Sequence, residues 1–240
     1  MFEKRRQYSY KEQKQQRYIF IKFLAGFFFF YLAYNCFSAF LFSVWTLDNN
    51  TMKPGLVSGD RLIFTSFSLP SWINIKKSEE RPLSFKRGSI VLIDMEHEKK
   101  MPLNIIDGLV RFFTAQRLSV FSADRQYYIK RVIGLPEDEI TMTGFVFRVR
   151  PSGSSFSLTE FELADKPYQP SVPKIPDLWD ESIPFSGYMD TIVIGQNECF
   201  VVADDRGNTN DSRTWGAIPL SSVTARAVFR FWPPTRIGFL

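Results

Sequence analysis

Residues 127–138 read YYIKRVIGLPED, and this run decides the fold class that the sequence predicts. Its aromatic and β-branched residues favour an extended strand, which the Gly-Leu-Pro at 134–136 ends in a turn. Comparable short runs recur at 61–64, 89–93, 144–150, 191–194, 199–203 and 222–231. Glycine and proline separate them, and no regular repeat is present. We therefore predict a mainly antiparallel β body.

Three stretches interrupt this pattern and are predicted to be inserts in the β body. Residues 65–87 and 94–126 are polar, and one short amphipathic helix is expected near 105–118. Residues 151–187 contain six prolines. Such a composition predicts a loop-rich insert, and it is compatible with either disorder or a small lobe.

Basic charge is confined to the start of the chain. The 240 residues carry a net charge of +5, and residues 1–22, with seven Lys or Arg and two Glu, already account for it. The remaining chain is formally neutral, which argues against a nucleic-acid-binding body. Residues 1–22 are therefore interpreted as a basic arm.

An uncharged run follows this arm, from residue 23 to residue 47. It is long enough for a membrane-spanning helix and too long for the apolar core of a cleaved signal peptide. Because positive residues stay in the cytoplasm, residues 48–240 are expected outside it, with membrane lipid as a partner. A buried helix in a soluble protein is the less favoured alternative.

Few residues are available for metal or imidazole chemistry. The chain has one histidine, His97, within a charged stretch, and two cysteines, Cys36 and Cys199. These are too few for a Cys/His zinc site, and we expect neither a metal nor a cofactor. A hydrolytic reaction here would need a base other than histidine.

Lys130 is the candidate base. Side chains alternate along a strand, so Lys130 lies on one face of the 127–133 run and Arg131 on the other. If both faces are covered, desolvation favours the neutral amine, which can accept a proton from a hydroxyl. The alternative is a lysine whose amine reaches water from the strand.

Three segments stand out when taken together: 49–60 (NNTMKPGLVSGD), 128–138 (YIKRVIGLPED) and 203–216 (ADDRGNTNDSRTWG). Their order and spacing resemble the sequence boxes of bacterial type I signal peptidases, the membrane-bound serine–lysine endopeptidases. Residues 86–91 (KRGSIV) and the ending 231–238 (FWPPTRIG) are similar to further family segments. The resemblance covers about residues 18–240 in outline and leaves the inserts unmatched. It implies a bacterial inner-membrane enzyme that removes signal peptides from secretory preproteins.

The resemblance also implies roles for individual residues. In the family a serine before Met-X-Pro is the nucleophile, and in this chain Thr51 stands there, with Lys130 as the base. Asn49 holds the place of a serine that assists the oxyanion, although it can equally be a helix-end cap. Thr209 replaces a serine that orients the lysine. Asp211 and Arg213 match an ion pair that supports the site, or else form a surface salt bridge in a turn.

Two further hypotheses are considered, and the first of them follows from the threonine at the nucleophile position. Its hydroxyl can attack when a base is adjacent, but the extra methyl restricts side-chain rotation. The alternative is therefore a catalytically impaired homologue that binds export segments or a membrane partner. A third hypothesis, a structural single-pass protein whose β body only mediates contacts, is disfavoured by the three boxes.

Overall fold

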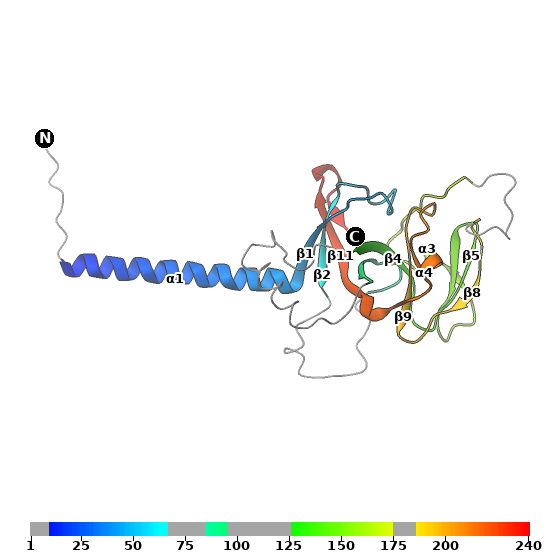
Figure 1. Cartoon of the computed structure of the whole chain (residues 1–240), viewed down its shortest axis with the longest axis horizontal. Helices are drawn as coiled ribbons and strands as arrows, with labels where there is room; N and C mark the ends of the chain where they lie inside the picture. Colours follow the sequence, from blue (N-terminus) through cyan, green and yellow to red (C-terminus); the bar gives the residue numbers. More distant parts are fainter. Residues whose placement is uncertain (1–9, 67–84, 96–125, 175–185) are drawn as a thin grey trace.

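A computed structural model describes residues 10–66, 85–95, 126–174 and 186–240 of the chain (Figure 1). His97 and the amphipathic helix expected near 105–118 lie outside the described residues. The first described element is the helix α1, Tyr10–Leu41, which extends away from the β body (Figure 1). Its side chains from residue 14 to residue 31 are all exposed. Among the described residues, no helix has both the length and the apolar character needed to cross a membrane.

The end of α1 corrects the predicted 23–47 helical span. The helix stops at Leu41, and Phe42–Thr46 forms the strand β1. β1 pairs antiparallel with β2, Arg61–Ser66, so that Val44 lies opposite Ile63. Val44, Trp45 and Thr46 favour extended backbone, and pairing with β2 satisfies their backbone polar groups. The absence of charge that suggested one continuous helix does not distinguish a helix from a strand.

The strands confirm the mainly antiparallel β body. Among the described residues, the larger sheet has eight strands in the order β1-β2-β11-β3-β4-β9-β10, with β12 paired to β11. Every pairing in it is antiparallel. The remaining bounds are β3 Ile90–Asp94, β4 Tyr127–Gly134, β9 Glu198–Val202, β10 Ile218–Pro219, β11 Val223–Trp232 and β12 Gly238–Phe239.

A smaller, four-stranded sheet lies beside the larger one, at the end of the body far from α1 (Figure 1). Its order is β7-β6-β5-β8, with bounds β5 Glu139–Thr143, β6 Val146–Arg150, β7 Leu158–Thr159 and β8 Met189–Val193. Gly144 and Phe145 join β5 to β6 with positive φ angles of 59° and 64°. Positive φ at both central residues is the geometry that a tight two-residue hairpin turn requires.

Four short helices complete the described body. They are α3 Glu160–Leu163, α4 Ser212–Trp215 and the 3-10 helices η1 Leu220–Ser222 and η2 Pro234–Arg236.

The predicted insert boundaries also need correction. Thr65 and Ser66 belong to β2, where Ser66 pairs with Ala225 of β11, and Asp94 belongs to β3. Residues 151–174, from the proline-rich insert, hold only β7 and α3 as regular elements. They nevertheless contact the body, because Ser171 forms a parallel bridge with Asp205. Local sequence gave no sign of these pairings, whose partners lie far along the chain.

Apolar side chains cover both faces of β4, and this burial positions the candidate site. On one face, Ile129 packs against a core cluster that includes Met52 and Leu56. On the other, Val132 belongs to a cluster with Val91 and residues of β9, and Tyr128 packs against it. A lysine at position 130 is therefore held inside the structure by its neighbours in the strand.

Candidate active site

Lys130 lies in the middle of β4 and is 2% exposed. Burial lowers the pKa of its amine from 10.5 to about 8; nearby Asp211 and Asp204 oppose the shift, and Arg213 adds to it. Within the described residues the amine makes no hydrogen bond or ion pair, and its Nζ lies 5.8 Å from the ring centroid of Trp215. The site therefore contains an amine that becomes neutral close to physiological pH.

Thr51 lies in the turn between β1 and β2. Two buried residues anchor this turn in the core, Met52 at 0% and Leu56 at 1% exposure, and the Leu56 N–H donates to the Met52 carbonyl. Thr51 itself is half-buried. A hydroxyl is thus presented at the surface of a turn whose following residues are fixed.

Asn49 faces Thr51 with its carbonyl oxygen. The Thr51 hydroxyl donates to Asn49 Oδ1 at 2.8 Å, and the Thr51 backbone N–H donates to the same atom at 3.3 Å. The sequence led us to expect an Asn49 amide that donates to an oxyanion alongside this N–H. In the structure Asn49 is instead an acceptor for Thr51, and it occupies the N–H.

One segment links Thr51 to the strand of Lys130. The Asp205 N–H donates to the Thr51 carbonyl at 3.0 Å. The preceding residue, Asp204, receives two hydrogen bonds from Arg131, the neighbour of Lys130, at 2.7 and 2.6 Å. Although both residues are described, no hydrogen bond joins the Thr51 hydroxyl to the Lys130 amine. The hydroxyl is directed at Asn49 in this arrangement.

The third box forms a compact turn beside Lys130. Asp211 is fully buried, caps α4 by accepting from the Arg213 N–H, and also accepts from the Ala203 N–H at 2.9 Å. Its ion pair with the Arg213 guanidinium measures 2.8 Å. The expected Asp211–Arg213 pair is therefore present, and it is buried rather than a surface salt bridge.

Thr209 lies in the same turn, where its carbonyl accepts from the Thr214 hydroxyl at 2.5 Å. Among the described residues its own hydroxyl makes no hydrogen bond to Lys130. The orienting role that the resemblance implies for Thr209 is not realised in this arrangement.

The sequence reasoning missed several residues that the structure brings to this site. The alternation of the strand puts Arg131 on the face opposite Lys130 but predicts no partner for it. A buried arginine requires an acidic partner, and Asp204 in the third box was the available signal. Trp215 belongs to the same box, but the sequence did not predict that its ring would lie near the Lys130 amine. Tyr168 and Glu160 come from the proline-rich segment, which carried no signal.

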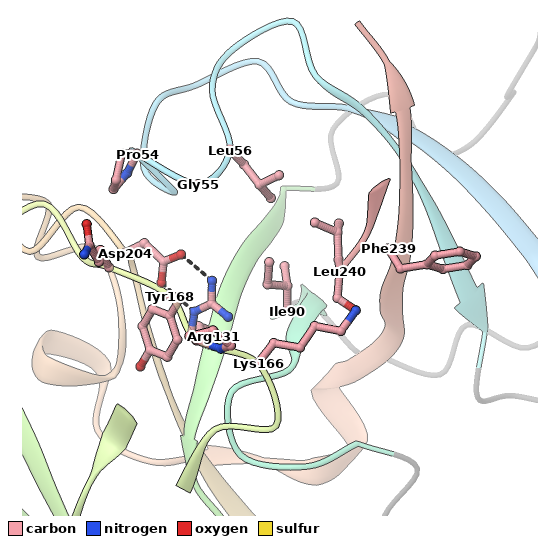
Figure 2. Close-up of a pocket in the computed structure, with 12 residues that line it drawn as sticks. Pro54, Gly55, Leu56, Ile90, Arg131, Lys166, Tyr168, Asp204, Phe239 and Leu240 are labelled. Atoms are coloured by element: carbon pink, nitrogen blue, oxygen red, sulfur yellow. Dashed lines mark hydrogen bonds and ion pairs between the residues drawn. The ribbon is translucent and has the colours of Figure 1, made fainter. Parts of the chain in front are cut away.

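A cavity of about 280 Å³ lies beside the turn that follows Thr51 (Figure 2). Pro54, Gly55 and Leu56 form one side of it, and Arg131 and Tyr168 form another. The Arg131–Asp204 ion pair thus lies between this cavity and the strand of Lys130.

The first half of β4 has an unpaired backbone edge. β9 pairs with β4 only from Arg131 onward, whereas β3 pairs with the whole range from Tyr127 to Arg131. Within the described residues no strand occupies the second edge of residues 127–130. Backbone donors and acceptors next to Lys130 are therefore available to an extended peptide.

Comparison with known proteins gives a consistent family. A sequence model described as "Signal peptidase, peptidase S26" matches residues 20–232. A probable signal peptidase I-2 of Synechocystis sp. is 32% identical over 196 residues, which are 81% of this chain and 65% of the relative. Signal peptidase I of Leptolyngbya laminosa is 35% identical over 115 residues, which are 47% of this chain and 45% of the relative.

A signal peptidase I P of Bacillus subtilis subsp. natto is 26% identical over 199 residues, 82% of this chain and 81% of the relative. The chain spans about half to two thirds of the length of the Leptolyngbya and Synechocystis relatives. The family model, in contrast, matches nearly all of the 240 residues. The chain therefore belongs to the signal peptidase family, peptidase S26.

Proposed function

We propose that this protein is a membrane-anchored endopeptidase that removes N-terminal signal peptides from exported preproteins. Thr51 is the nucleophile and Lys130 the general base. One observation carries this proposal: a buried amine, with its pKa lowered to about 8, is coupled through Asp204 and Asp205 to the turn that presents a hydroxyl. The names of the relatives, all signal peptidases, support the same activity.

The reaction starts with rotation of the Thr51 side chain from Asn49 toward the amine. Neutral Lys130 then takes the hydroxyl proton as the oxygen attacks the scissile carbonyl. Once the Asn49 oxygen has moved away, the Thr51 N–H is free to donate to the oxyanion, and the Asn49 amide can turn to donate beside it. The ammonium returns its proton to the leaving amine, which leaves an ester on Thr51. Water activated by Lys130 hydrolyses this ester.

The neighbouring polar residues would support these steps. The Thr209 hydroxyl would orient the Lys130 amine after rotation of its side chain. The buried Asp211–Arg213 pair holds α4, and with it Trp215, against the amine. The balance of one anion and one cation keeps the amine from being strongly stabilised in its charged form.

The substrate would bind as an added strand along residues 127–130. Among the described residues this edge is free, whereas β2 is already paired on both edges by β1 and β11. A signal peptide paired with this edge would lie beside the backbone of Lys130. Backbone pairing would fix the scissile bond with little dependence on side chains, which suits a varied set of preproteins.

Membrane attachment through α1 completes the proposal. The exposed side chains of α1 include Phe23, Phe27, Phe28, Phe29 and Phe30. Exposure of this much apolar surface to water would be unfavourable. The basic arm precedes them, so the N-terminus would lie in the cytoplasm and the β body on the outer side of a bacterial inner membrane. Lipid would then be a partner, and the site would meet preproteins held in the same bilayer.

Three forms of Thr51 test the nucleophile. The purified full chain in lipid–detergent micelles is given a preprotein, and cleavage is followed for wild type, Thr51→Ala and Thr51→Ser. We expect Thr51→Ala to lose about 1,000-fold or more in kcat and Thr51→Ser to keep or exceed wild-type turnover. Thr143→Ala, at an exposed position of the smaller sheet, is the matched control.

Two outcomes would contradict the proposal. Equal cleavage by wild type and Thr51→Ala would remove Thr51 from the reaction. Activity in Thr51→Ser alone would mean that the native chain is an impaired homologue, the alternative function.

A further inference from the structure

Tyr168 comes from the proline-rich segment, and its ring packs against the guanidinium of Arg131 (Figure 2). The Arg131 Cζ atom is 3.8 Å from the centroid of the Tyr168 ring. At its other end the Tyr168 hydroxyl donates to Glu160 Oε2 at 2.5 Å. Burial, followed by the charge of Glu160, raises the pKa of Tyr168 well above its usual value, so the hydroxyl stays protonated and keeps donating. The ring is thus held at both ends.

Arg131 is fixed in position by this ring and by three hydrogen bonds. Two go to Asp204, and the third runs from Nη1 to the Gly88 carbonyl at 2.6 Å. These bonds are donated by Nε, Nη1 and Nη2, and the Tyr168 ring packs against the same guanidinium. An aromatic ring packed on a guanidinium restricts the orientations that it can adopt. The orientation of Arg131 in turn fixes the carboxylate of Asp204.

The segment that contains Tyr168 also forms backbone hydrogen bonds with Asp204 and Arg206. The Ser171 N–H donates to the Asp204 carbonyl and the Arg206 N–H donates to the Ser171 carbonyl, both at 2.8 Å. Glu160, which receives the Tyr168 hydroxyl, also pairs with Arg206 at 2.5 Å. Residues 204–206 are therefore held by contacts with residues 160–171. The same three residues bind Thr51 through the Asp205 N–H.

We propose that Tyr168 is a positioning residue of the active site, which acts by keeping the Arg131–Asp204 ion pair in place behind Lys130 and Thr51. This inference rests on the peptidase function proposed above and assigns a catalytic task to a segment that matched no family box. Tyr168 does not touch the reacting groups, and it acts only through Arg131.

The charged groups around Lys130 make its pKa a measure of how well Arg131 is held in position. The charged groups that act on the amine are Asp211 and Arg213 from α4 and its cap, and Asp204 from the end of β9. Two titratable side chains, Tyr128 and Cys199, line the same face of the sheet. With Arg131 in place, the charge of Asp204 is largely neutralised. Loosening Arg131 leaves more of that negative charge to act on Lys130, which favours the protonated amine.

Two variants of Tyr168 separate the ring from the hydroxyl. In Tyr168→Ala the Arg131 guanidinium loses the ring that packs against it. The space left by the ring joins the adjacent cavity, so water can reach Arg131. We expect the rising limb of the kcat–pH profile to move upward by roughly 0.5 pH unit or more, with activity largely recovered above it. Tyr168→Phe keeps the ring and loses only the bond to Glu160, so its limb should stay at the wild-type pH while its thermal midpoint falls. Tyr188→Phe, at an exposed tyrosine before β8, controls for the substitution.

Lys130 is also titrated without turnover, from the NMR shift of 13C-methylated lysines in the full chain, with Lys130→Met to assign its signal. The Lys130 titration should move upward in Tyr168→Ala and not in Tyr168→Phe. An unchanged titration in a folded Tyr168→Ala protein, or a uniform loss of activity at every pH, would overturn the positioning role. A wild-type protein that cleaves no preprotein would instead refute the proposed function and leave the Lys130 titration to decide this inference. Should Tyr168→Ala fail to fold, Tyr168→Leu replaces it with the same two expected shifts.

Discussion

Lys130 combines a strand position with almost complete burial, and the two together define its chemistry. The side chain is 2% exposed between covered faces of β4, and burial is the largest cause of its lowered pKa. A histidine would titrate near neutral pH without such help, whereas a lysine in water would remain protonated. Desolvation is therefore what makes this residue usable as a base.

The same burial predicts a pH dependence of both rate and stability. The proposed reaction needs neutral Lys130, so kcat should rise with pH through about 8 and then level off. The folded pKa lies below the unfolded value of 10.5, so the unfolded chain binds more protons between these two values. The contribution of Lys130 to the free energy of unfolding therefore increases from pH 8 to pH 10.5 and is unfavourable below that window.

Lys130→Met tests both consequences in one variant. Methionine has a similar length and no charge, so turnover should be abolished while the free energy of unfolding at pH 7 increases by about 1–3 kcal/mol. Urea unfolding followed by tryptophan fluorescence at pH 7 and pH 10 measures the gain, which should shrink at the higher pH. A variant that is less stable than wild type at pH 7 would show that the amine is not destabilised by burial.

At the scale of elements, α4 and its cap shift the pKa of Lys130. Asp211 caps this four-residue helix, pairs with Arg213 and accepts from Ala203, so one carboxylate joins α4 to the end of β9. Its charge is also the largest of the influences that raise the pKa of Lys130 against desolvation. The ion pair therefore acts on the proposed base through both position and charge.

Asp211→Asn should shift the kcat–pH limb in the direction opposite to Tyr168→Ala. Removing the anion leaves desolvation and Arg213 to lower the pKa of Lys130. The rising limb of the kcat–pH profile should therefore move down by roughly 0.5–1 pH unit. The maximal rate should also fall, since the turn loses its ion pair. Asp190→Asn, on an exposed position of β8, is the control. An upward or absent shift in Asp211→Asn would show that this carboxylate does not act on the amine.

At the scale of the whole molecule, the helix and the β body share a boundary without a linker. α1 ends at Leu41 and β1 begins at Phe42. Trp45 of β1 packs against the core, with its ring centroid 4.6 Å from that of Tyr127, and Leu47 is 2% exposed. The first residues after the helix are therefore part of the folded body.

Two truncations separate the proposed anchor from the body. A chain that lacks residues 1–41 keeps β1 and should fold and cleave a short soluble peptide, but lose most cleavage of a preprotein inserted in vesicles. A chain that lacks residues 1–47 also loses Trp45 and Leu47, and the removal of buried side chains of this size costs about 2–5 kcal/mol each. Circular dichroism melting and cleavage assays compare the two. Equal melting temperatures would show that β1 is dispensable for the body.

Local sequence was sufficient for the fold class and for the opposed faces of Lys130 and Arg131. Aromatic and β-branched runs separated by glycine and proline predicted the strands, and alternation placed the two side chains. β5 was missed, although Glu139-Ile-Thr-Met-Thr143 alternates in the same way. The boxes identified the family because their residues are close together in the sequence.

Tertiary structure alone decided where α1 gives way to β1, which strand edge is free among the described residues, and which residues pack against the candidate site. An uncharged segment such as 42–47 is compatible with helix or strand until a partner such as β2 pairs with it. Tyr168 and Arg131 are separated by 36 intervening residues, and no spacing rule relates them. Burial, pairing and the resulting pKa of Lys130 depend on contacts between distant segments, which a linear pattern of residues does not contain.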